Sequence, residues 1–359
     1  MKKIILFTDS LGAGGAQRQL VGLAIMLKEK GYLVKVVTYH NFSFYKKVLD
    51  DCDIQNDLLV SPSNPLKRIF VIYEYFKKEN PDWVIAYQEV PSLIACLVKK
   101  MGCHYKSIVS ERNTTQTISL KDKLRFFFYR GANAIVPNSY SQERFLLSHY
   151  PWMQSKIKTI TNFVDLDSFV PSAIVSRSAI PKFLVVGSIA HSKNTRGMIE
   201  ACRILKSKGI RIKLLWYGWS DNPTPFMIEM KNLISSFALS DYIEFRNKSL
   251  DIVKVYQDAE YYCMPSFFEG TPNVLCEAVS CGLPIISSNV CDNSIYAKEA
   301  YNAFLFNPSS PKEIAECMIK IINLSDRDYH QFCLNSRQVA EKYLSKESFI
   351  DKYLKIIEE

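Results

Sequence analysis

The sequence lacks the long apolar runs that mark membrane-spanning segments. No stretch approaches the roughly 18 uninterrupted apolar residues that a transmembrane helix needs. The apolar run that follows Met1-Lys2-Lys3 stops at Asp9, and no small-residue cleavage site comes after it. We therefore predict that residues 4–8 form a first strand and not a signal peptide.

Cysteine pairs with the spacing of metal ligands are also missing. The ten cysteines are scattered from Cys52 to Cys333 without one C-x-x-C pair. This distribution argues against a zinc site and a disulfide framework, and it predicts reduced, buried thiols in a cytoplasmic protein. None of the five histidines has a partner that marks it as a general base, so no histidine-based acid–base pair is expected.

Low-complexity tracts and fixed-period repeats are absent as well. With 359 residues, 48% of them hydrophobic and 23% charged, the chain has the balance of a globular protein and enough length for two domains. Its formal net charge is +9, and residues 1–170 carry 23 Lys and Arg against 15 Asp and Glu. A basic surface on one side of the molecule indicates an anionic partner, such as nucleic acid, phospholipid headgroups or a phosphorylated acceptor; the alternative is simply a soluble basic domain.

Short apolar strands alternate with helical segments, which predicts parallel sheets covered on both faces. The expected strands are residues 4–8, 33–39, 83–87, 106–110 and 134–137, then 183–186, 212–217, 242–246, 261–264 and 284–287. Between residues 162 and 181 the periodicity is lost, as in an interdomain linker. We predict two doubly wound α/β domains, 1–170 and 171–344, with a helix at about 345–359 packing back on the first.

A glycine-rich turn follows the first predicted strand. It reads Gly12-Ala13-Gly14-Gly15-Ala16-Gln17, and such a turn lets a phosphate or sugar approach the backbone and the next helix N-terminus. A dinucleotide-binding fingerprint would need glycine at Gln17 and an acid after the second strand, where Thr38-Tyr39-His40 stands instead. A nicotinamide enzyme is therefore not expected, and a tight turn without a ligand is the alternative.

The most informative segment is residues 266–286. Gly270-Thr271-Pro272 predicts a turn, and a helix is expected to begin near Asn273 with its positive dipole end available to a diphosphate. Glu269 precedes this turn and Glu277 lies on the first turns of the helix, where both could hold a polyhydroxylated ligand. The alternative is a helix-capping acid and a solvated helix acid.

This segment resembles the donor-site signature of the family 4 retaining glycosyltransferases, which have the GT-B fold. Three further segments resemble signatures of that family: the amino-terminal glycine loop at Gly14-Gly15-Ala16-Gln17, a linker motif at residues 162–169, and a second glycine loop at residues 186–194. The family commonly has an acid where Gln17 stands. The resemblance spans roughly residues 1–325 in motif order.

The resemblance implies a metal-independent hexosyltransferase with two Rossmann-like domains facing across a cleft. It would move a sugar from a nucleotide-diphosphate donor, with UDP expected, to a glycan or lipid-linked acceptor of surface polysaccharide biosynthesis, without a cofactor. Glu269 would stabilise charge at the anomeric carbon. The expected donor-binding residues of the second domain, and of the first-domain loop, are Gly15, Gly187, Ser188, Lys193, Arg196, Gly270, Thr271, Pro272, Asn273, Val274 and Glu277. The acceptor-side candidates of the first domain are Glu111, Arg112, Asn113 and Asn138.

One position departs from the family. An arginine that usually pairs with the lysine at Lys193 to bind the diphosphate is replaced by Ser188. Arg196 follows Lys193 by three residues, and it would lie on the same face if the helix has begun, so we hypothesise that it supplies the lost charge.

Residues 121–130 mix basic and aromatic side chains, as a surface for lipid headgroups would; a core helix with snorkelling ends is the alternative. We expect a cytoplasmic enzyme that works at the inner face of the cell membrane, and no nucleic-acid partner. A GT-B nucleotide-sugar epimerase, a basic nucleic-acid-binding protein and a catalytically inactive sugar-binding homologue remain alternatives.

Overall fold

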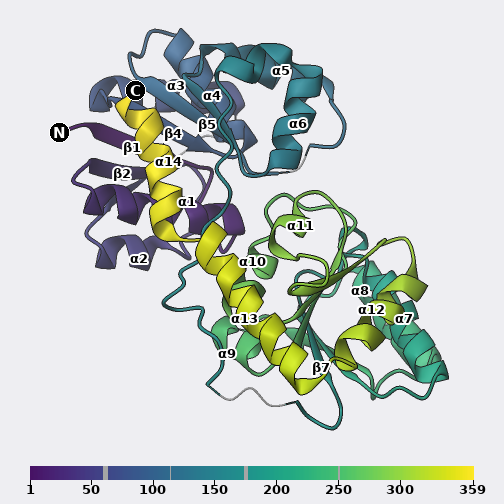
Figure 1. Cartoon of the computed structure of the whole chain (residues 1–359). Helices are drawn as coiled ribbons and strands as arrows, with labels where there is room; N and C mark the ends of the chain where they lie inside the picture. Colours follow the sequence, from purple (N-terminus) through teal and green to yellow (C-terminus); the bar gives the residue numbers. More distant parts are fainter. Residues whose placement is uncertain (60–63, 114, 174–176, 250) are drawn as a thin grey trace. The chain divides into compact units, whose positions relative to one another are not determined.

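Two parallel sheets form the framework of the chain (Figure 1). The computed structural model describes residues 1–59, 64–113, 115–173, 177–249 and 251–359. Contacts divide the chain into unit 1, Met1–Asn162 with Lys346–Glu359, and unit 2, Phe163–Ser345. Within the described ranges, no helix combines the length and the apolarity that crossing a bilayer requires.

The sheet of unit 1 has the strand order β3-β2-β1-β4-β5-β6. The order reverses between β1 and β4, and in such sheets ligands bind beyond the carboxyl ends of the strands at this switch point. The strands are β1 (Lys3–Phe7), β2 (Leu33–Thr38), β3 (Gln55–Leu58), β4 (Trp83–Tyr87), β5 (Lys106–Glu111) and β6 (Ala134–Pro137). The helices are α1 (Gly15–Glu29), α2 (Lys46–Asp51), α3 (Pro65–Glu79), α4 (Glu89–Lys100), α5 (Leu120–Phe128), η1 (Tyr129–Gly131), α6 (Tyr140–His149), η2 (Pro151–Ser155) and α14 (Lys346–Glu358).

The sheet of unit 2 repeats this plan with the order β12-β11-β10-β7-β8-β9, so β7 and β10 flank its switch point. The strands are β7 (Lys182–Val186), β8 (Lys213–Trp219), β9 (Ile243–Asn247), β10 (Tyr261–Met264), β11 (Ile285–Ser288) and β12 (Ala303–Phe306). The helices are η3 (His191–Lys193), α7 (Thr195–Ser207), α8 (Pro225–Ser236), α9 (Ile252–Gln257), α10 (Asn273–Ser280), α11 (Asn293–Tyr296), α12 (Pro311–Ile322) and α13 (Asp326–Tyr343).

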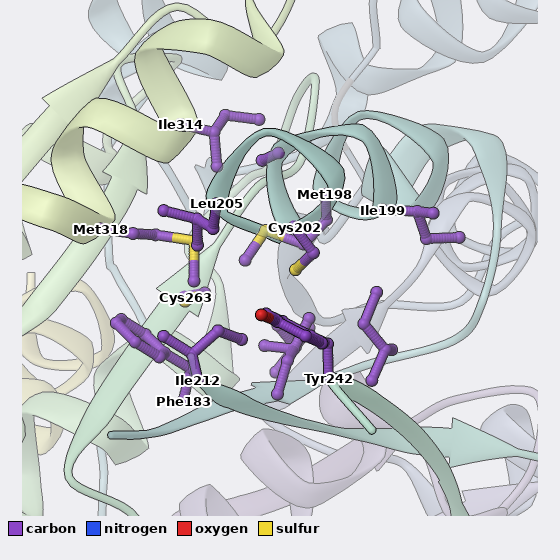
Figure 2. Packing of buried hydrophobic residues seen from close by; sticks show 14 of the residues in the cluster. Phe183, Met198, Ile199, Cys202, Leu205, Ile212, Tyr242, Cys263, Ile314 and Met318 are labelled. Carbon is purple, nitrogen blue, oxygen red and sulfur yellow. The ribbon is translucent and has the colours of Figure 1, made fainter. Parts of the chain in front are cut away.

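Helix α7 packs on the unit 2 sheet through residues at helical spacing. Met198, Cys202 and Leu205 are fully buried and, like Phe183 of β7 and Cys263 of β10, belong to one hydrophobic cluster (Figure 2). Positions i, i+4 and i+7 share one helix face, so burying this face orients α7. Its first turn then follows directly from the loop after β7.

The two short strands β3 and β12 were not predicted. Each is the edge strand of its sheet, and β3, with the sequence Gln-Asn-Asp-Leu, has no fully buried residue. The polar edge strand β3 has no apolar run by which the hydrophobic pattern could reveal it, whereas β12 has the apolar sequence Ala-Phe-Leu-Phe and was overlooked.

The structure moves the boundary between the units from residue 170 to residue 162. Residues 163–170 are packed in unit 2: the Val164 N–H donates to the Leu344 carbonyl (2.9 Å), and Phe169 contacts the second core cluster of that unit. The absence of periodicity predicted a linker for residues 162–181. A segment without regular secondary structure can nevertheless be packed into a domain by such contacts. Residues 174–176 of this span lie outside the described ranges.

Most of the ten cysteines are buried, and none is in a disulfide. Burial raises the pKa of the thiols of Cys96, Cys202 and Cys281 from 9.0 to about 12. A buried thiolate would lose its hydration without gaining a partner. The folded protein therefore keeps these protons at a pH at which the unfolded chain releases them.

We expect the free energy of unfolding to fall as the pH rises from 9 towards 12. Above pH 9 the unfolded chain binds fewer protons than the folded chain, so the slope is negative, and each of the three thiols contributes about 1.4 kcal/mol of lost stability at pH 10. Urea unfolding at pH 8 and pH 10 measures this loss. Cys202→Ala should reduce the loss between the two pH values, whereas equal losses in both proteins would contradict the assignment.

Candidate functional site

A close approach of two backbone segments shapes the loop that follows β7. The Gly187 carbonyl accepts a hydrogen bond from the Trp216 indole N–H (2.8 Å), and the Gly187 N–H donates to the Tyr217 carbonyl (2.9 Å). A Cβ on Gly218 would lie 1.8 Å from the Gly187 carbonyl oxygen. The carboxyl ends of β7 and β8 can therefore approach this closely only because residue 218 has no side chain.

Lys193 and Glu269 form an ion pair at this edge of the sheet, with side chains that are 28% and 13% exposed. Lys193 ends η3, and Glu269 lies in the loop between β10 and α10. The two loops are also joined through their backbones, because the Phe267 N–H donates to the Ser192 carbonyl (3.0 Å). The rings of His191 and Phe267 stack with their centroids 5.5 Å apart. The structure thus brings together two charged residues that the sequence separates by 76 positions.

The helix α10 begins three loop residues after Glu269, at Asn273. Thr271 and Pro272 are buried, while Gly270, Asn273 and Val274 are partly exposed. The N-cap residue of α10 is Pro272, whose side chain makes no capping hydrogen bond, and no acid lies in the first turn of the helix. The first turn of α10 thus carries the positive end of the helix dipole and backbone N–H groups that lack intrahelical acceptors.

Glu277 lies one turn further along α10 and is buried. Its Oε2 accepts a hydrogen bond from the Tyr256 hydroxyl of α9 (2.9 Å). Burial and the nearby Glu277 charge raise the pKa of Tyr256, so the phenol keeps the proton that it donates. A solvated helix acid, the alternative interpretation of Glu277, is therefore wrong, and its carboxylate is held in a fixed orientation.

Ser188 and Arg196 flank the same loop. Ser188 is exposed, and the Arg196 guanidinium forms an ion pair with Glu229 of α8 in which both side chains are about half exposed. Arg196 is thus paired with Glu229, and its hypothesised contact with a diphosphate stays a prediction.

In unit 1, the predicted glycine loop leads into α1, which begins at Gly15. A Cβ on Gly14 would lie 2.2 Å from Gln17 Oε1, and Gln17 Nε2 donates to Asp9 Oδ1 (3.2 Å). Gln17 therefore has a structural role where the family commonly has an acid: it ties the first turn of α1 to the end of β1.

Gln88 follows β4 at the switch point of the unit 1 sheet. Its backbone has φ +76° and ψ 166°, a conformation that is strained for any residue except glycine. Its Oε1 accepts from the Thr8 hydroxyl (3.1 Å), which follows β1. The sequence gives no signal for this strained residue.

Glu111 is completely buried, and its assignment as an acceptor contact is wrong. Its carboxylate lies 3.2 Å from the Arg125 guanidinium and accepts from the Tyr129 hydroxyl. Burial raises the pKa of Glu111, and the Arg125 charge opposes this shift. A polar residue at a strand end has the same sequence pattern whether it faces a ligand or a buried partner.

The other three acceptor-side candidates differ in exposure. The buried Arg112 donates to the Tyr353 hydroxyl (2.7 Å) and to Asn162 Oδ1 (3.1 Å), so it is bound to α14 and to the end of unit 1. Asn138 is buried beside it, with Nδ2 3.4 Å from the Arg112 carbonyl. Only Asn113 is exposed, and its amide contacts Glu89 (3.5 Å).

Two Asp-x-Asp runs in the sequence, residues 51–53 and 165–167, have the spacing of carboxylate metal ligands, but they do not converge on a cation site. Asp53 pairs with Lys28 (2.9 Å), and Asp165 accepts from the Ser168 hydroxyl (2.9 Å) in a local turn. Across the part of the chain that the structure describes, no group of three or more His, Cys, Asp or Glu is placed to hold a metal ion.

Three residues that shape the unit 2 site were missed. Tyr256 orients Glu277, Trp216 holds the Gly187 carbonyl, and Gly218 permits the approach of β7 and β8. A glycine inside an apolar strand, here in the sequence Trp-Tyr-Gly-Trp, is a signal of close backbone approach. The sequence around Tyr256 gives no comparable signal.

Two family models match consecutive parts of the chain. The model described as Glycosyltransferase Family 4 matches residues 13–168, and the model described as Glycosyl transferases group 1 matches residues 173–339. Together they cover the glycine loop of unit 1 and all the unit 2 loops described above.

Two relatives from Campylobacter jejuni are similar over most of their length. One is the N-acetylgalactosamine-N,N'-diacetylbacillosaminyl-diphospho-undecaprenol 4-alpha-N-acetylgalactosaminyltransferase, 25% identical over 80% of this chain and 81% of its own. The other is the GalNAc-alpha-(1->4)-GalNAc-alpha-(1->3)-diNAcBac-PP-undecaprenol alpha-1,4-N-acetyl-D-galactosaminyltransferase, 24% identical over 100% of this chain and 99% of its own.

Solved structures agree in fold. The Anabaena protein HepE in complex with UDP-glucose has a TM-score of 0.86 at 14% identity, with 100% of both chains covered. A glycosyltransferase from Rickettsia africae has a TM-score of 0.86 at 20% identity, covering 99% of this chain and 98% of its own. The chain belongs to the family 4 glycosyltransferases of the GT-B fold and is a sugar-transferring enzyme.

Proposed function

We propose that the protein transfers a sugar, with retention of anomeric configuration, from a UDP-linked donor to a lipid-linked glycan acceptor in surface polysaccharide biosynthesis. The observation that carries the donor site is the Lys193–Glu269 ion pair close in the fold to the N-terminus of α10, whose first turn contains no acid. A cation and a helix N-terminus suit a diphosphate, and a carboxylate suits the positive charge of a glycosyl transition state.

The donor would separate the two partners of this pair. Its diphosphate takes the Lys193 ammonium and the first-turn N–H groups of α10, and Glu269 is then available to the sugar. These positive groups neutralise the leaving diphosphate, so we propose that no metal is needed. Glu277, oriented by Tyr256, would accept hydrogen bonds from the ribose hydroxyls.

Ser188 leaves the diphosphate with one cation fewer than is usual in the family. Arg196 could supply that charge only by leaving Glu229. An exposed ion pair is worth about 0–1 kcal/mol, so a diphosphate could compete for the guanidinium. Arg196 is thus a candidate second cation.

We propose that the acceptor binds to unit 1 and is presented at the membrane surface. Both Campylobacter relatives are named for undecaprenol-linked substrates, and HepE was solved with UDP-glucose. In unit 1, the strained Gln88 and the exposed Asn113 lie at carboxyl ends of strands, where ligands bind in this type of sheet. We propose that the enzyme works as a peripheral protein at the inner face of the cell membrane.

UDP is expected to stabilise the protein against thermal unfolding. At about a hundred times its Kd, a ligand of the folded state adds about 2.7 kcal/mol. A thermal-shift panel of nucleoside diphosphates and their sugars would identify the base, and Lys193→Ala and Glu277→Gln should each reduce the shift. Lys312→Ala, at an exposed lysine of α12, is the matched control.

Three outcomes decide the details. No shift with any nucleotide would contradict the donor site, and a reduced shift in Arg196→Ala would assign the second cation. Donor turnover without an added acceptor would favour an epimerase over a transferase.

A further inference from the structure

Helix α5 of unit 1 presents a stripe of apolar side chains to solvent, while its Phe126 is fully buried. Leu120, Leu124 and Phe127 are 83%, 55% and 56% exposed, and their spacing of four and three residues places them in one stripe. Arg125, which lies on the other side of the helix, is only 3% exposed. A surface helix of a globular protein normally turns its apolar side chains towards the core, whereas in α5 Phe126 is in the core and this second stripe stays exposed.

Buried ion pairs fix α5 in this orientation. The Arg125 guanidinium lies 3.0 Å from Glu89, 3.2 Å from Glu111 and 3.0 Å from Asp122. If the helix rotated to bury the apolar stripe, the guanidinium and the three carboxylates would lose their partners. Leaving the buried charges of Arg125 and Glu111 unpaired is strongly unfavourable. Ser119 adds a capping box at the start of the helix. The exposed stripe is therefore a stable feature of the surface.

Cations surround the stripe. Lys121 and Lys123 are exposed on α5 itself. Lys100, at the end of the neighbouring α4, places its ammonium 5.9 Å from the ring centroid of Phe127 and 5.5 Å from that of Phe128. Figure 1 shows α5 at the edge of unit 1. We refer to Leu120, Leu124 and Phe127 with Lys100, Lys121 and Lys123 as the α5 patch.

The same unit carries the whole charge excess of the protein. Unit 1 has 26 Lys and Arg against 17 Asp and Glu, and unit 2 has 19 of each. Of the 20 large hydrophobic side chains that are exposed among the described residues, 14 belong to unit 1. Apolar exposure and positive charge are thus concentrated in the same unit.

We propose that the α5 patch docks on an anionic lipid bilayer, with the apolar stripe inserted at headgroup level and the lysines at the lipid phosphates. An interfacial helix combines these two features. A second copy of the chain would bring a like-charged surface against these lysines, which opposes pairing. The proposal rests on the proposed function, since a lipid-linked acceptor would be reached from this position.

Co-sedimentation with vesicles tests the docking surface. We expect binding to vesicles that contain phosphatidylglycerol and little binding to pure phosphatidylcholine. Replacing both Leu124 and Phe127 with serine should weaken binding about tenfold or more, and each of Lys100→Gln, Lys121→Gln and Lys123→Gln about fivefold. The matched control replaces Leu66 and Phe70 of α3, which are 69% and 61% exposed, with serine and should bind like the wild type.

Three results would overturn the proposal. They are unchanged vesicle binding by the α5 double variant, loss of binding by the α3 control, or a lower sedimentation coefficient of the α5 variant without vesicles, which would reveal a contact between copies. UDP-induced stabilisation is measured in the same samples. UDP binding without vesicle binding rejects only the docking surface, and vesicle binding without any nucleotide response rejects only the proposed donor site.

Discussion

Replacing Glu269 with glutamine is expected to lower kcat by about 10²–10³-fold, because the loss of one preorganised electrostatic contact to a transition state has this effect. Glutamine keeps the shape of the side chain and can still accept a hydrogen bond from Lys193, but it carries no negative charge to face a glycosyl cation. UDP affinity should change much less than kcat. Transfer of labelled sugar to a lipid-linked acceptor, together with UDP titration, separates the two quantities.

Glu244→Gln is the matched control. Glu244 also lies in unit 2 and is paired with two cations, Lys213 and Arg246, on β8 and β9. Its substitution should leave kcat within about twofold, as surface changes away from a site do. If the Glu269 and Glu244 variants had similar activity, the proposed role of Glu269 would be rejected.

Gly218→Ala should destabilise unit 2 and weaken donor binding together. The new methyl group would meet the Gly187 carbonyl 1.8 Å away, and backbone cannot rotate aside as a flexible side chain could. Overpacking of this kind costs about 3 kcal/mol or more. Separating β7 from β8 would also displace the loop that leads to Lys193. Urea unfolding is followed by tryptophan fluorescence, to which Trp216 and Trp219 of β8 contribute from unit 2, and Trp83 and Trp152 from unit 1.

Gly131→Ala provides the comparison, because nothing lies within 4 Å of a Cβ at that position. Its stability should match that of the wild type within about 0.5 kcal/mol. Equal stability of the Gly218 and Gly131 variants would show that the strands can separate without cost.

The sequence was sufficient to predict the strands that lie inside the sheets. The predicted segments 83–87 and 261–264 coincide with β4 and β10, whose residues are all buried. Burial on both faces demands an uninterrupted apolar run, which is visible in a sequence. The edge strand β3 is polar and was missed because it has no such run. The edge strand β12 does have one, Ala-Phe-Leu-Phe, and was overlooked.

The candidate site was only partly predictable, for a related reason. Glu269, Lys193 and Glu277 were identified one by one from motifs, but a motif does not say that Lys193 and Glu269 pair or that Tyr256 orients Glu277. Such contacts depend on which loops the sheet brings together. The error at Glu111 has the same origin, since its partner Arg125 lies on a helix whose buried side was not recognised.

Helix α14 gives the protein an unusual order of assembly. It is synthesised after all of unit 2, yet it belongs to unit 1, where its Tyr353 hydroxyl bonds to Tyr87 (2.8 Å) and Arg112 (2.7 Å). Until α14 leaves the ribosome, the guanidinium of Arg112 lacks one of its acceptors. Synthesis of unit 1 therefore begins first and ends last. While unit 2 is being synthesised, unit 1 of the nascent chain lacks helix α14.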